Sequence, residues 1–134
     1  EPGSSLDPLM RDRLCDRMRE YLDDGDGRKS IIFSTHNIAD MENAADYAVF
    51  MDKGHVIEQG FIEELKEKYI VVSGDAENWE QAKSLMSGSH NRTTFDGLAL
   101  SENSEALAAL NAETAAPTLQ QLSVGLLKYA EEHR

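Results

Sequence analysis

The sequence predicts an α/β protein, and three patterns in the first half of the chain support this fold class. A helical apolar stripe comes first, then a short apolar run with strand character, then a second such run that enters a tight turn. A strand, a short helix and two further strands in this order are typical of an α/β layer with an antiparallel edge. The chain has 134 residues, enough to bury one modest core.

The first predicted element is a helix that begins at Pro8. Asp7 is placed to cap it, and proline is favoured at a first helical position. Residues 23–27 contain two glycines between acidic residues, so the helix should end there in a surface turn. The apolar stripe of this helix consists of Met10, Leu14, Met18, Tyr21 and Leu22.

Strand signals follow in two places. Residues 30–35 are apolar and β-branched, which predicts a strand buried on both faces, as in a parallel sheet. Asn37 can cap a short helix after it. Residues 47–51 form the second apolar run, and the turn at residues 52–54 predicts a hairpin with residues 55–60.

The second half of the chain has weaker signals, apart from its last helix. We expect a helix from Phe61 to about Lys68, a strand at 69–72, a helix at 77–86 and a possible strand at 93–100. Residues 102–116 have no clear pattern, and no internal repeat is apparent. Thr118 and Gln121 have capping-box spacing, and the apolar face of the final helix consists of Leu119, Leu122, Leu126 and Tyr129.

The charge balance limits the classes of partner. The formal net charge of −12 argues against a nucleic-acid groove or an anionic lipid surface, because both favour clustered Lys and Arg. The single cysteine, Cys15, cannot form an internal disulfide, which favours a reducing compartment such as the cytoplasm. The dispersed histidines predict no metal site. No apolar run is long enough for a membrane helix, so we expect any membrane link to pass through a partner.

Three ordered segments resemble one protein family, the ATP-binding-cassette (ABC) ATPases. Residues 1–8 read Glu-Pro-Gly-Ser-Ser-Leu-Asp-Pro and resemble the family signature E-P-x-x-x-L-D-P. Residues 31–36 read Ile-Ile-Phe-Ser-Thr-His, similar to the family's strand and switch histidine. Residues 45–60 are similar to the family stretch from an Ala-Asp pair to the glycine after the hairpin.

The resemblance implies the C-terminal part of a P-loop, RecA-like cassette, whose ligands in the parent protein are ATP and Mg²⁺. It implies that Glu1 and His36 are catalytic: Glu1 positions the attacking water, and His36 contacts the γ-phosphate. It also implies that Asp7 acts toward the nucleotide across a dimer of two nucleotide-binding subunits. These roles suit phosphoryl transfer to water, which depends on positioning the nucleophile and stabilising charge.

Each of these residues also has an ordinary structural interpretation. Glu1 can be a solvated terminal residue, and Gly3 to Ser5 can be a cloning remnant. Asp7 can be only a helix cap, and His36 only a loop histidine. Their joint order and spacing favour the family interpretation.

The phosphate-binding motif G-x-x-x-x-G-K-[ST] does not occur in the sequence. Gly25 to Ser30 has the wrong spacing for it and follows two aspartates that would repel a triphosphate. We therefore expect residue 1 to be a cut inside a longer ATPase, and we expect this chain alone neither to bind nor to hydrolyse ATP.

The predicted organisation has two parts. Residues 1–67 are assigned to the cassette, and residues 68–134 to a small α/β accessory or regulatory extension. Residues 117–122, Pro-Thr-Leu-Gln-Gln-Leu, resemble a motif near the end of exporter subunits of the antibiotic-resistance type. The predicted parent is an ABC transporter ATPase, peripheral on the inner face of the membrane through a transmembrane permease subunit.

Two alternatives remain open at this stage. The chain can be a regulatory or dimerisation module built on a cassette remnant, with the interaction carried by residues 68–134. It can also belong to a cassette ATPase outside transport, although the acidic balance disfavours that class.

Overall fold

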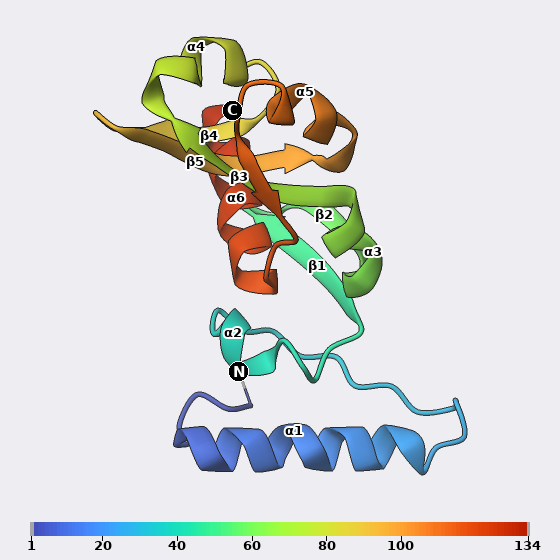
Figure 1. Ribbon diagram of the computed structural model, residues 1–134. Helices are drawn as coiled ribbons and strands as arrows, with labels where there is room; N and C mark the ends of the chain where they lie inside the picture. The colour runs from blue at the N-terminus through green and yellow to red at the C-terminus, as the bar shows by residue number, and fades with distance from the viewer. Residues whose placement is uncertain (1, 134) are drawn as a thin grey trace. The chain divides into compact units, whose positions relative to one another are not determined.

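The computed structural model describes residues 2–133, apart from the side chains of residues 40 and 41, in two compact units. The first unit comprises residues 1–45 and the second residues 46–134. The predicted mixture of helices and strands is confirmed, with a two-stranded and a four-stranded sheet, both antiparallel (Figure 1). The predicted boundary between residues 67 and 68 separates the cassette from its extension, not these two structural units, and it stays a prediction.

The first helix, α1, spans Pro8–Asp23 as predicted. The Asp7 side chain accepts a hydrogen bond from the Met10 backbone N–H at 2.9 Å, and Pro8 occupies the first helical turn. This pairing satisfies one of the backbone donors that every helix leaves open at its N-terminus. The helix ends at Asp23, and a turn follows in which Asp26 and Gly27 both have positive φ, 51° and 76°.

The predicted buried strand at residues 30–35 is wrong. The structure places residues 28–35 in irregular conformation, and the Ile32 side chain is 96% exposed. A strand of a parallel sheet is held by hydrogen bonds to neighbouring strands and by apolar layers on both faces. The described residues of the first unit contain no other strand to supply those bonds.

The short helix after this segment is confirmed as α2, Ile38–Met41. Asn37 occupies its N-cap position but makes no side-chain capping bond, which corrects the expected role. Its backbone N–H instead donates to Thr35 Oγ1 at 2.9 Å. This bond fixes the backbone just before α2, but it does not replace the side-chain cap that the sequence suggested.

The predicted hairpin is confirmed as β1, Tyr47–Asp52, and β2, His55–Phe61. Its two-residue loop has φ of 48° at Lys53 and 80° at Gly54, the signs that a type I′ turn requires. Tyr47 and Phe61 face each other across the strands, with ring centroids 5.2 Å apart in an edge-to-face contact. This aromatic pair stabilises the open end of the hairpin.

The rest of the second unit is built on a four-stranded sheet with the order β4-β5-β3-β6. After the predicted helix α3, Ile62–Lys68, two strand–helix–strand passages follow along the chain. This order and topology are those of a ferredoxin-like β-α-β-β-α-β fold. The elements are β3 (Tyr69–Asp75), η1 (Ala76–Asn78), α4 (Trp79–Ala82), β4 (Ser87–His90), β5 (Thr94–Leu100), η2 (Ser101–Asn103), α5 (Ser104–Ala108) and β6 (Glu113–Ala115).

Each face of this sheet has helical cover (Figure 1). On one face α4 and α5 enclose the main core, which comprises Val72, Ala82, Phe95, Ala99 and Leu107. On the other face lies α6, Leu119–Glu132, whose predicted capping box is confirmed. Leu119, Leu122 and Leu126 of α6 are buried, whereas Tyr129 is half exposed.

A structural repeat that was not apparent in the sequence relates the two strand–helix–strand passages. Each has a one-turn 3₁₀ helix of the form x-Glu-Asn before its α-helix, ending at Asn78 in the first passage and Asn103 in the second. The Asn78 side chain donates to the Leu110 carbonyl at 3.1 Å, and the Asn103 side chain donates to the Leu85 carbonyl at 3.0 Å. Each asparagine thus ties its own passage to the end of the other's helix.

Candidate functional site

The three residues predicted to act on nucleotide belong to the first unit. Glu1 lies outside the described residues. Asp7 is exposed and caps α1, so its ordinary structural role is observed. His36 is exposed and lies between the irregular segment 28–35 and α2. The roles of these residues toward ATP stay predictions.

The loop before α1 is held by the helix that follows it. Gly3 is buried, and its carbonyl accepts hydrogen bonds from the Leu6 backbone N–H at 3.1 Å and from Arg11 Nε at 3.0 Å. A Cβ on Gly3 would touch the Arg11 side chain at 3.4 Å. The loop that carries the family-like signature therefore has a defined shape, fixed against the first turns of α1.

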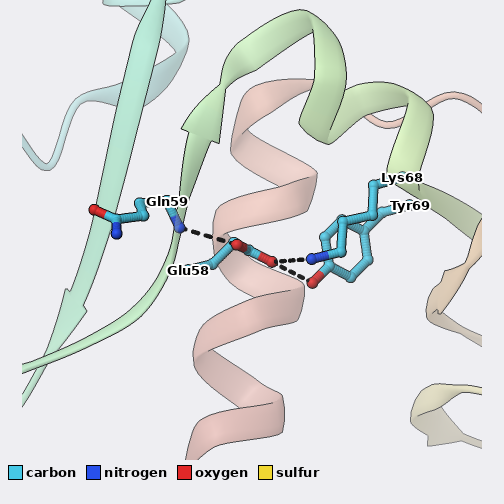
Figure 2. A network of polar contacts seen from close by, with 4 residues as sticks. All are labelled: Glu58, Gln59, Lys68 and Tyr69. Carbon is cyan, nitrogen blue, oxygen red and sulfur yellow. Dashed lines mark hydrogen bonds and ion pairs between the residues drawn. The ribbon is translucent and has the colours of Figure 1, made fainter.

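The second unit contains a polar network that sequence reasoning missed (Figure 2). The Glu58 side chain on β2 accepts a hydrogen bond from the Tyr69 hydroxyl at 2.6 Å and an ion-paired bond from Lys68 Nζ at 2.9 Å, both on Oε2. Its other oxygen accepts from the Gln59 backbone N–H at 3.0 Å. The network joins the hairpin to the point where α3 ends and β3 begins.

This environment shifts the pKa of both acidic groups. Burial opposes ionisation of Glu58, but the bonds from Tyr69, Lys68 and the Gln59 backbone outweigh it and hold its pKa below the ordinary value. Burial, followed by the bond to the Glu58 carboxylate, raises the pKa of Tyr69 well above its usual range. At neutral pH a carboxylate anion therefore faces a neutral phenol and a lysine cation. These protonation states indicate that Glu58 and Tyr69 have a structural role and do not exchange protons in catalysis.

We expect Glu58→Gln to destabilise the second unit by about 1–2 kcal/mol at pH 7, mostly through Tyr69, because the half-exposed Lys68 is screened by solvent. The folded-state pKa of Glu58 is depressed, so its contribution is present above the unfolded pKa and is lost as pH falls through the folded pKa. Urea unfolding at several pH values measures this. The difference between wild type and variant should disappear in acid.

Glu63→Gln on α3 is the matched control for Glu58→Gln, because it removes the same charge from an exposed site. Its free energy of unfolding should stay within about 0.5 kcal/mol of wild type. A loss at Glu58 that persisted unchanged below the folded pKa would contradict the assigned network.

Two other kinds of feature are absent from the described residues. Among the described residues, no group of three His, Cys, Asp or Glu side chains is placed to hold a metal ion. No helix in the described part of the chain is long and apolar enough to cross a membrane.

Comparison with known proteins finds relatives of one kind. The chain is 32% identical over 93 residues to YxlF of Bacillus subtilis, an uncharacterised ABC transporter ATP-binding protein, covering 65% of this chain and 30% of the relative. It is 37% identical over 68 residues to the phosphate import ATP-binding protein PstB of Thermotoga maritima, covering 51% and 26%. It is 33% identical over 60 residues to the glutamine transport ATP-binding protein GlnQ of Escherichia coli, covering 45% and 24%.

These matches cover only part of each protein. The chain spans less than a third of the length of the relatives named here. Three further relatives at 32–35% identity are also named as transporter ATP-binding proteins. No protein-family model matches the chain.

Proposed function

We propose that this chain, which is similar to ATP-binding proteins of ABC transporters over part of their length, is the C-terminal part of a subunit that couples ATP hydrolysis to transport. Its parent is an ATPase that uses Mg²⁺-ATP. The parent pairs with a second nucleotide-binding subunit and with a transmembrane permease. It lies on the cytoplasmic face of the membrane through that permease.

The observation that carries this proposal is the agreement between motif order and relatives. Three family-like segments occur in the order and at the spacing of a cassette, at residues 1–8, 31–36 and 45–60. The relatives, found by overall similarity, are all named as ATP-binding proteins of transporters.

Within the cassette, each residue has a proposed role at the γ-phosphate. Glu1 orients and deprotonates the attacking water, which a carboxylate can do without contacting the phosphates that would repel it. His36 donates a hydrogen bond to the γ-phosphate, and its second ring nitrogen can pair with another group in the assembled site. Asp7, at the start of α1, couples the two nucleotide sites across the dimer. The phosphates themselves bind to a P-loop in the parent.

In this proposal, residues 1–67 are the C-terminal portion of a RecA-like cassette, and residues 68–134 form the accessory extension. The exposed Ile32 in the segment at residues 30–35 fits this proposal, because its apolar side chain would gain strand neighbours in the parent. The alternative is that residues 68–134, which contain the four-stranded sheet, act as a regulatory or dimerisation module.

The proposal is tested by comparing the intact gene product with the 134-residue chain. The intact protein should bind and hydrolyse Mg²⁺-ATP, measured by nucleotide titration and phosphate release, whereas the chain alone should do neither. The matched control is the intact protein with its P-loop lysine replaced by alanine. An intact gene product without a P-loop, or one that releases no phosphate, would contradict the proposal.

A further inference from the structure

An open groove lies on the face of the four-stranded sheet that α6 crosses only in part. It has a volume of about 650 Å³ and is bounded by strands β3 to β6 and by one flank of α6. The flank presents residues 118, 121, 124, 125 and 128, which recur at helical spacing and extend over about 15 Å. The groove is therefore long enough to hold several residues of another polypeptide.

The floor of the groove is a row of polar side chains across all four strands. The strand register pairs Ser89 with Asp96, Asp96 with Ser73, and Ser73 with Glu113. Side chains directly opposite each other in a sheet point to the same face, so this row shares one face. All four are exposed, and the two carboxylates flank Ser73.

The next row along the strands is apolar apart from Ser87 and lies closer to α6. Leu98 is buried and is paired with Val71, which is partly exposed. Gly125 allows α6 to approach this row, because a Cβ there would lie 2.9 Å from the Leu98 Cβ. Val124 of α6 remains 45% exposed beside the groove. The groove thus offers an apolar strip along one side and carboxylates along the other.

The charges in the groove select against anions. Among its described lining residues, Lys128 is the only cation, whereas Asp96 and Glu113 both lie on the floor. The chain as a whole has a net charge of −12. A phosphate group or an anionic lipid surface would be repelled, and an amphipathic segment with Lys or Arg is the complementary occupant.

We propose that this groove binds a basic amphipathic segment of the transporter's membrane subunit, a proposal that rests on the proposed function. Membrane proteins carry an excess of Lys and Arg in their cytoplasmic loops, and this is the surface that a peripheral subunit meets. The basic side chains pair with Asp96 and Glu113, and the apolar side chains contact Val71 and Val124. The extension then serves as a second attachment point for the permease, separate from the nucleotide site.

The test uses the 134-residue chain and a fluorescently labelled synthetic helical peptide of Lys and Leu, with a Glu and Leu peptide as its acidic counterpart. Anisotropy titration should show the Lys peptide binding at least about tenfold more tightly than the Glu peptide, since opposite charges attract across the interface. Asp96→Lys and Glu113→Lys should each weaken Lys-peptide binding by about tenfold, because like charges then face each other. Amide NMR shifts should concentrate on β5, β6 and the groove flank of α6.

Glu105→Lys is the matched control, because it makes the same charge change at an exposed position of α5, on the opposite face of the sheet. It should weaken binding by less than about twofold, reflecting only the net charge. Equal weakening by Glu105→Lys and Asp96→Lys would overturn the proposal, as would equal affinity for the two peptides. These titrations contain no ATP, so their failure is distinct from a failure of the intact protein to hydrolyse ATP.

Discussion

Replacing Glu1 by Gln in the intact gene product should lower ATP turnover by at least about 100-fold while leaving ATP binding nearly unchanged, because a positioned general base contributes that much or more. The amide keeps the size of the side chain but cannot take a proton from water. The measurement is phosphate release at saturating Mg²⁺-ATP, with nucleotide affinity determined separately. Since the loss is confined to the chemical step, kcat should fall and the dissociation constant for ATP should not rise.

Glu20→Gln is the matched control for this experiment. Glu20 is exposed on α1 and loses the same charge without any assigned role in catalysis. Its turnover should remain within about twofold of wild type, since it affects only a screened surface charge. Hydrolysis by the Glu1→Gln protein at the wild-type rate would remove Glu1 from the proposed mechanism, although the sequence similarity to transporter ATP-binding proteins would be unaffected.

The parts of the fold that were predictable have strong local signals. Helix α1 has an apolar stripe, an Asp7 cap and a proline at its start, all within a few residues. The hairpin has an Asp-Lys-Gly turn between two apolar runs, and the positive φ of Gly54 explains why glycine stands there. Helix α6 has both halves of a capping box at Thr118 and Gln121. Each of these signals depends only on residues close together in the sequence, so the element could be predicted without knowing the tertiary structure.

The strand predicted at residues 30–35 failed because its formation depends on distant neighbours. Its composition favours a strand, yet a parallel strand gains its stability only from the strands beside it. The described residues of the first unit offer none, and Ile32 is left exposed. The composition of this segment favours a strand, but the sequence does not show whether neighbouring strands are present to pair with it.

The edge strands of the four-stranded sheet were missed for the opposite reason. Residues 87–90 are Ser-Gly-Ser-His, which have little intrinsic preference for strands, and β6 has only three residues. Pairing with β5 and β3 imposes their conformation. The groove was missed for the same reason, because Ser73, Asp96 and Glu113 are distant in sequence and only strand register aligns them.

The Glu58 junction was likewise invisible in the sequence. Glu58 lies within a strand and Lys68 at the end of a helix, and nothing in their spacing indicates a shared hydrogen-bond network. The acidic candidates Glu1 and Asp7 could be named because a family motif surrounds them. The role of a residue such as Glu58 depends on how this one chain packs, so it can be identified only from the three-dimensional structure.

Replacing Phe95 by Ala should cost the second unit about 3–5 kcal/mol, a large share of the 5–15 kcal/mol that stabilises a typical domain. Phe95 is 1% exposed and its ring lies 5.7 Å from that of Trp79, centroid to centroid. Trp79 is the single tryptophan of the chain, so its fluorescence during urea unfolding reports on this core. Phe61→Ala is the matched control, because that side chain is 55% exposed, and it should cost about 1 kcal/mol or less.

A double-mutant cycle with Gly74 makes this prediction specific to the Phe95 ring. Gly74 faces Phe95 across β3 and β5, and a Cβ at Gly74 would lie 2.6 Å from Phe95 Cζ, so Gly74→Ala alone should cost about 1–3 kcal/mol through overpacking. In the Phe95→Ala background the ring is gone and the new methyl has room, so the same change should be neutral or slightly stabilising. A coupling free energy of at least about 1 kcal/mol would follow. Additive costs would show that the ring does not occupy the space that Gly74 leaves open, and would contradict the packing of this core.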